Sequence, residues 1–159
     1  MNSNIFRIIV FFVVLLTLPL LTLSNKEIDF KNLEAENIKI FFSENIEVEN
    51  FKTYKNGVGC YAVVNQNQAN KFLSADCLSG LSFESKQSYK NILKNLNAKI
   101  VSVQNIKINE ENKTIVYAFS NNFHKFMIVN GQKVNVQIAV GNEKAVVGLP
   151  LLLGSYWVC

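Results

Sequence analysis

VNGQKVNVQIAV, residues 129–140, carries the clearest structural pattern in the chain. Its Asn-Gly dipeptide at 130–131 lies between alternating apolar residues and favours a hairpin with a type I′ turn, because both central residues of that turn need positive φ. The apolar residues after the turn share one face of a strand: Val134, Val136, Ile138 and Val140. Asn135 and Gln137 point to the opposite face. The pattern therefore predicts a sheet with one solvated face.

The same period of two extends along much of the chain. Apolar and polar residues alternate over 98–108 and over 113–120, and the sequence NEEN forms the turn between these two runs. Further strands are predicted over 38–42, 46–54, 58–64, 124–129, 132–140 and 145–157. Strands joined by short turns pair in an antiparallel manner. We therefore expect a mostly antiparallel sheet of five or more strands.

Apolar residues at helical spacing predict two helices, over 66–78 and 85–96. Asn65 and Gln68 have the spacing of a capping box at the start of the first helix, and Ser85 is the expected cap of the second. The second helix is expected to bury Tyr89, Ile92, Leu93 and Leu96, and to expose Lys86, Lys90 and Lys94. The predicted fold class is α+β, with both helices packed on one face of the sheet.

An apolar run of 16 residues, 8–23, follows the positive side chain of Arg7. A helix of this length spans about 24 Å, which is shorter than the hydrocarbon core of about 30 Å. The run is long enough for the apolar region of a secretory signal peptide, and the small residues Thr22 and Ser24 allow cleavage after Ser24. Residues 1–24 are therefore predicted to be a signal peptide, or an N-terminal membrane anchor if they are not cleaved.

Both forms of this segment place the rest of the chain outside the cytoplasm, because a positively charged segment ahead of an apolar run stays inside. Residues 25–159 are then either secreted or anchored to the membrane through residues 8–23. They are numerous enough for one hydrophobic core and contain no low-complexity linker. We therefore expect them to form a single extracytoplasmic domain.

Charge is unevenly distributed along the chain. Residues 25–50 hold seven acidic side chains and three lysines, whereas residues 51–159 hold twelve lysines and five acidic side chains. Arg7 is the only arginine, so the predicted domain lacks the planar guanidinium that binds phosphate or guanine through two hydrogen bonds. A nucleic-acid partner is therefore not expected.

The chain contains three cysteines, Cys60, Cys77 and Cys159. If the first predicted helix folds back along the preceding strand, Cys60 and Cys77 lie nearly level with each other, since about 13 Å of strand faces about 16 Å of helix. A Cys60–Cys77 disulfide is therefore predicted, with buried free thiols as the alternative. Pairing of Cys159 with either of the others stays open.

Residues for catalysis are scarce. His124 is the only histidine, and neither a second histidine nor a cysteine lies at the spacing of a metal site. We expect no catalytic residue, metal or cofactor. The alternative is a small exported hydrolase in which a carboxylate, or the thiol of Cys60 or Cys77, works with His124.

Residues 78–157 resemble the YwmB family of exported bacterial proteins. The resemblance rests on LSGLSFESKQSYKNILKNLNAKIV (78–101), IVYAFS (115–120), VNGQKVNVQIAV (129–140) and VGLPLLLGSY (147–156). It implies a fold like that of the TATA-box-binding protein, with a curved antiparallel sheet and helices on its convex face. It also implies a signal segment or anchor and an origin in spore-forming Gram-positive bacteria. The family has no established biochemical activity.

These observations predict a noncatalytic module of the cell envelope that binds a protein or a cell-wall component. The expected binding residues lie on the solvated face of the sheet and are Lys133, Asn135 and Gln137. A DNA-binding role does not follow from the resemblance, because the chain is expected to be exported and its predicted sheet lacks arginine.

Overall fold

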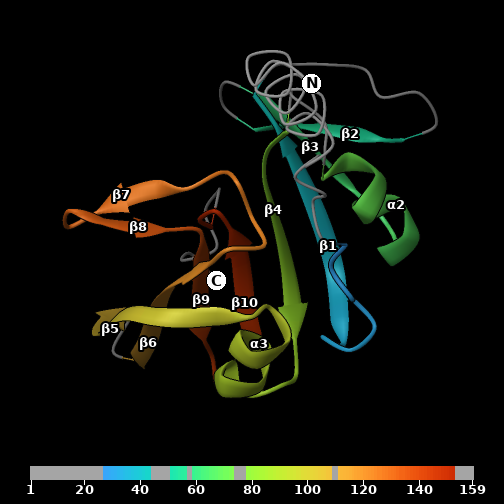
Figure 1. Ribbon diagram of the computed structural model, residues 1–159. Helices are drawn as coiled ribbons and strands as arrows, with labels where there is room; N and C mark the ends of the chain where they lie inside the picture. Colours follow the sequence, from blue (N-terminus) through green and yellow to red (C-terminus); the bar gives the residue numbers. More distant parts are fainter. Residues whose placement is uncertain (1–26, 44–50, 57–58, 74–77, 109–110, 153–159) are drawn as a thin grey trace, which may run out of the picture.

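The computed structural model describes residues 27–43, 51–56, 59–73, 78–108 and 111–152 (Figure 1). Eight strands form one sheet in the order β2-β3-β1-β4-β10-β9-β6-β5, and every neighbouring pair is antiparallel. In chain order these strands are β1 (Ala35–Phe42), β2 (Thr53–Asn56), β3 (Gly59–Val63), β4 (Leu78–Ser85), β5 (Ala98–Ile108), β6 (Glu111–Ser120), β9 (Val136–Val140) and β10 (Ala145–Leu149). A separate two-stranded sheet consists of β7 (Met127–Val129) and β8 (Gln132–Val134). The helices are α2 (Gln66–Phe72) and α3 (Tyr89–Asn95).

The hydrophobic core lies on one face of the large sheet. Cross-strand partners share a face, and the partners on this face are apolar in strand after strand: Ala62, Ile40, Leu81 and Leu149 form one row, and Phe83, Val147, Ile138 and Val116 form another. The buried helix residues Ala69, Ile92 and Leu93 belong to the same cluster. Both helices therefore cover one face of the sheet, which confirms the predicted α+β class.

The first helix begins where the sequence predicts and ends earlier. Asn65 Oδ1 accepts a hydrogen bond from Gln68 N, and Gln68 Oε1 accepts one from Asn65 N, each at 3.0 Å, so the capping box is confirmed. The prediction that this helix continues to residue 78 is wrong, because Leu78 opens β4, where it lies opposite Phe42 of β1. Pairing with β1 takes priority over the helical spacing of the apolar residues.

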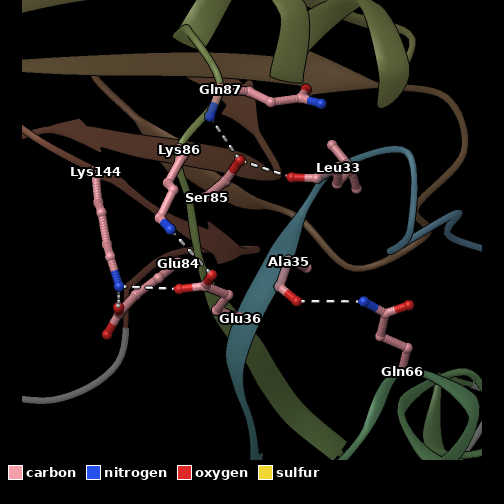
Figure 2. A network of polar contacts seen from close by, with 9 residues as sticks. All are labelled: Leu33, Ala35, Glu36, Gln66, Glu84, Ser85, Lys86, Gln87 and Lys144. Carbon is pink, nitrogen blue, oxygen red and sulfur yellow. Dashed lines mark hydrogen bonds and ion pairs between the residues drawn. The ribbon is translucent and has the colours of Figure 1, made fainter.

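The second helix begins later in the chain than predicted. Ser88, and not Ser85, is the N-cap of α3. Ser85 is the last residue of β4, and its hydroxyl donates a hydrogen bond of 2.6 Å to Leu33 O and accepts one from Gln87 N (Figure 2). The predicted stripe is confirmed at Ile92, Leu93 and Leu96, which are buried, whereas Tyr89 is only partly buried against the core.

The strands of the C-terminal half mostly follow the alternating pattern. The range 98–108 is confirmed as β5, and Asn130 and Gly131 have φ of 50° and 79°, as the predicted turn requires. Two predictions are wrong. The run 132–140 is interrupted at Asn135, so that β8 and β9 belong to different sheets. The last strand ends at Leu149, and the chain then folds back over Gly148, where a Cβ would overlap the backbone of Leu151 and Leu152.

Four charged side chains connect three strands at one end of the sheet (Figure 2). Glu36 of β1 and Glu84 of β4 are cross-strand partners, and Lys144, just before β10, places Nζ 3.0 Å from Glu36 Oε2 and 3.1 Å from Glu84 Oε2. Lys86 Nζ lies 3.6 Å from Glu36 Oε1. The hydrogen bond from Lys144 holds the pKa of Glu36 below its usual 4.5, and the bonds to Glu36 and Glu84 raise the pKa of Lys144 above 10.5. Lys144 thus offsets the repulsion between two adjacent carboxylates.

The variant Lys144→Met should lower stability at neutral pH and lose this effect in acid. A carboxylate with a lowered pKa stabilises the fold above its unfolded pKa of about 4.5, and this contribution disappears as the pH falls through the lowered folded value. Urea unfolding at low salt, measured at pH 7 and pH 3, should therefore show a larger difference between wild type and variant at pH 7 than at pH 3. Lys55→Met, on the edge strand β2, is the control. An equal difference at both pH values would contradict the stabilising role of Lys144 beside the Glu36 and Glu84 carboxylates.

Candidate binding surface

Asn135 lies inside the structure and not on a solvated face. Its side chain is 0% exposed. Oδ1 accepts a hydrogen bond of 2.7 Å from Ser120 N, and Nδ2 donates to Ser120 O at 2.7 Å and to Phe123 O at 3.0 Å. The predicted exposure of this residue is therefore wrong, because the amide is used to hold the chain between β6 and β7 against the start of β9.

Gln137 is also buried, with 8% of its surface exposed. The segment that folds back after Pro150 covers it, and Leu152 N donates a hydrogen bond of 2.9 Å to Gln137 Oε1. Gly148, the cross-strand partner of Gln137, leaves room for this return. The prediction of a solvated face is therefore wrong at Asn135 and Gln137, because their side chains form hydrogen bonds with backbone groups.

Lys133 is exposed, as predicted, but lies on the separate β7–β8 hairpin. Its Nζ lies 4.5 Å from the centroid of the Phe126 ring, which is the geometry of a cation–π contact. Ile128 of β7 is its cross-strand partner. The lysine is therefore part of an apolar surface and not of a polar sheet face.

The catalytic alternative gains no support from the described residues. His124 is exposed in the loop before β7. Cys60 is buried in β3 opposite Phe42, a position that gives solvent little access to a thiolate nucleophile. Cys77 lies outside the described residues, so the Cys60–Cys77 disulfide stays a prediction. In the described part of the chain, no group of three His, Cys, Asp or Glu side chains could hold a metal ion.

A depression of about 540 Å³ lies between β1 and the start of α2 and is lined by Ala35, Ile38, Val64 and Gln66 among others. Two of its polar side chains, Asn65 and Gln66, already have partners. Asn65 and Gln68 form the capping box, and Gln66 Nε2 donates a hydrogen bond of 3.3 Å to Ala35 O (Figure 2). The depression is thus part of the connection between helix and sheet.

Three of the seven exposed large apolar side chains of the described residues lie on the hairpin or directly before it, and Ile128 is the most exposed of the seven. Phe126, Met127 and Ile128 are 43%, 46% and 60% exposed. We call these three residues with Lys133 the hairpin surface, which includes both faces of the hairpin: Ile128 and Lys133 share one face, and Met127 lies on the other with Val134. Figure 1 shows the hairpin (orange) extending away from the eight-stranded sheet. The sequence HKFMIV predicts a strand here, but a run of apolar residues does not reveal that the strand leaves the sheet and stays half exposed.

Edge strand β5 carries two further exposed apolar side chains. Its Ile100 and Val103 are 51% and 49% exposed. The two elements are close to each other, because β8 lies against β6, and β6 pairs with β5 along its length. Five of the seven exposed large apolar side chains of the described residues therefore belong to two elements that both contact β6; the other two are Tyr54 and Val63. Lone exposed apolar residues need no explanation, whereas a group of them marks an interaction site.

Comparisons with known proteins do not extend this assignment. A scan against protein-family models gave no match, and searches among curated proteins and among solved structures gave none either. The resemblance to the YwmB family stays a prediction. Neither described helix has the length and apolar character needed to cross a membrane, and residues 1–24 lie outside the described part of the chain.

Replacing Asn135 with alanine should destabilise the protein strongly. The change leaves the buried N–H and C=O of Ser120 without side-chain partners, and we expect a loss of about 3 kcal/mol of unfolding free energy. Thermal or urea unfolding measures this loss. Asn142→Ala, at an exposed position, is the matched control and should cost little. Equal stability of the two variants would show that the side-chain hydrogen bonds of Asn135 contribute nothing to the fold.

Proposed function

We propose that this chain is a noncatalytic binding module of the cell envelope and that it binds a protein through the hairpin surface and the neighbouring strand β5. The observation that carries the proposal is that these two elements hold five of the seven exposed large apolar side chains of the described residues. Phe and Met are enriched at the centres of protein interfaces, and Lys133 beside the Phe126 ring suits the polar rim of such a patch.

The energy available from this surface favours a protein partner. Complete burial of a large apolar side chain contributes about 1.5–3 kcal/mol. A partner that covered the exposed halves of these five side chains would therefore contribute roughly 4–8 kcal/mol of binding free energy. A polar wall polymer could not bury them, whereas a second protein with an apolar patch could. Between the two expected kinds of partner, an envelope protein and a cell-wall component, we therefore favour the protein.

The proposal includes the predicted location outside the cytoplasm. It is supported by the apolar run at 8–23, which follows Arg7 and precedes small residues. The predicted resemblance to exported proteins of Gram-positive bacteria agrees with this location. An envelope partner is the kind of protein that such a chain would meet.

Capture from native cells tests the proposed surface. The full chain with an affinity tag should retain a specific envelope protein after cross-linking, and Phe126→Ser/Met127→Ser/Ile128→Ser should lose it, because the apolar contact is removed. Tyr54→Ser/Val63→Ser removes two of the other exposed apolar side chains of the described residues and should retain the partner. Retention by the hairpin variant, or loss by the control variant alone, would refute the assignment of the surface.

A reporter fusion tests the proposed location. An alkaline phosphatase joined to the C-terminus is active only outside the cytoplasm, and we expect full activity. Replacing Leu15 and Leu16 with lysine interrupts the apolar run and should keep the reporter inside and inactive. Activity of a cytosolic reporter at the same position, with none from the phosphatase, would contradict the envelope role.

A further inference from the structure

We infer that β5 offers its open backbone edge to an extended acidic segment of the partner, which adds one strand to the sheet. This inference rests on the proposed function, since it describes how the same partner is held. Strand addition supplies main-chain hydrogen bonds for affinity, and alternate side chains supply specificity.

The position of β5 in the sheet provides the edge. Within the described residues, β5 is the last strand of the sheet order and pairs only with β6. It is 11 residues long, whereas β2 at the opposite edge has four. A bulge between Ile100 and Ser102 interrupts its register, and regular pairing continues from Ser102 to Ile108. This regular part is long enough for a bound strand of ordinary length.

Exposed apolar side chains lie along this edge. Val103 is the cross-strand partner of Val116, and Ile100 is the partner of Ala118; both partners are fully buried. Ile100 and Val103 therefore share the core face of the sheet but stay about half exposed, because no further strand lies beside them in the described structure. An added strand would cover them with its own alternate side chains and so continue the core outward.

The charges on and near β5 favour an acidic segment as the added strand. Residues 85–109, which contain α3 and β5, hold no acidic side chain and five lysines: Lys86, Lys90, Lys94, Lys99 and Lys107. Lys86 is paired with Glu36, and the other four are exposed. An incoming segment with aspartate or glutamate at alternate positions would match this surface, whereas a basic segment would be repelled.

The same lysines disfavour a second copy of the chain as the occupant. Two β5 strands paired with each other would bring Lys99 and Lys107 of both copies to one interface without an acidic residue from either strand. Lysines and bulges on edge strands are known protection against pairing of like edges. The β5 edge therefore disfavours pairing with the β5 edge of a second copy and favours pairing with a segment of opposite charge.

A peptide of alternating glutamate and valine residues tests the inference on the full chain in detergent. Fluorescence anisotropy should show binding, and hydrogen exchange should show that every second amide from 102 to 107 gains protection, because alternate N–H groups of a strand point to the same side. Two control peptides separate the contributions. Replacement of glutamate by lysine should abolish binding, and N-methylation of alternate residues should abolish the alternating protection without changing charge.

Charge-reversal variants locate the site. Lys99→Glu/Lys107→Glu should weaken binding of the glutamate peptide about tenfold, since two surface ion pairs are lost and repulsion adds to the loss. Lys52→Glu/Lys55→Glu makes the same change in net charge near β2 and should leave the affinity unchanged. Equal effects of the two variants, equal binding of the N-methylated peptide, or dimers of the chain formed through β5 would overturn the inference.

The hairpin variant distinguishes failure of this inference from failure of the proposed function. Phe126→Ser/Met127→Ser/Ile128→Ser should still bind the glutamate peptide at β5 while losing the envelope partner. If the wild-type chain retains that partner through the hairpin but the peptide gives no protection at β5, strand addition is wrong and the proposed function stands. If the peptide protects β5 but no partner depends on the hairpin, the proposed function is wrong and strand addition at β5 stands.

Discussion

The buried side chain of Asn135 is the constraint on which the shape of this protein depends. Three hydrogen bonds fasten it to Ser120 and Phe123, and its own N–H donates to Ala118 O at 3.1 Å. The chain is thereby fixed to the end of β6, and the residues before it separate from the sheet as β8. Because β8 ends at Val134, the β7–β8 hairpin leaves the large sheet, and although Val134 is buried, Met127 and Ile128 of β7 stay about half exposed.

Much of the fold follows from local patterns that need only neighbouring residues. Asn130-Gly131, the Asn65–Gln68 capping box and the alternation over 98–108 are each confirmed. These signals depend on backbone geometry within a few residues, so no tertiary contact has to be known. The errors at Leu78 and Ser85 arise where pairing between distant strands overrides local preference, since Leu78 meets β1 and Ser85 bonds to Leu33.

The candidate site was less accessible to sequence reasoning. Alternation identifies the residues that point away from the core face at β9. It does not show whether water or backbone groups form hydrogen bonds with their side chains. Asn135 and Gln137 are satisfied by Ser120, Phe123 and Leu152, and the last of these depends on the return of the chain over Gly148. The exposed run Phe126–Ile128 has the composition of a buried strand. Its exposure follows from the place where β8 separates, a tertiary feature with no sequence signal of its own.

The strand order also affects how the protein is made. β10 lies between β4 and β9 in the middle of the sheet, yet it follows every other strand of the described residues. A ribosome that has released β1 to β9 has produced two parts of a sheet, without the strand that joins them. Such late long-range pairing slows folding and leaves unpaired strands exposed in the meantime. Under the proposed export, this delay would be an advantage, because a finished sheet could not pass through a narrow translocation channel.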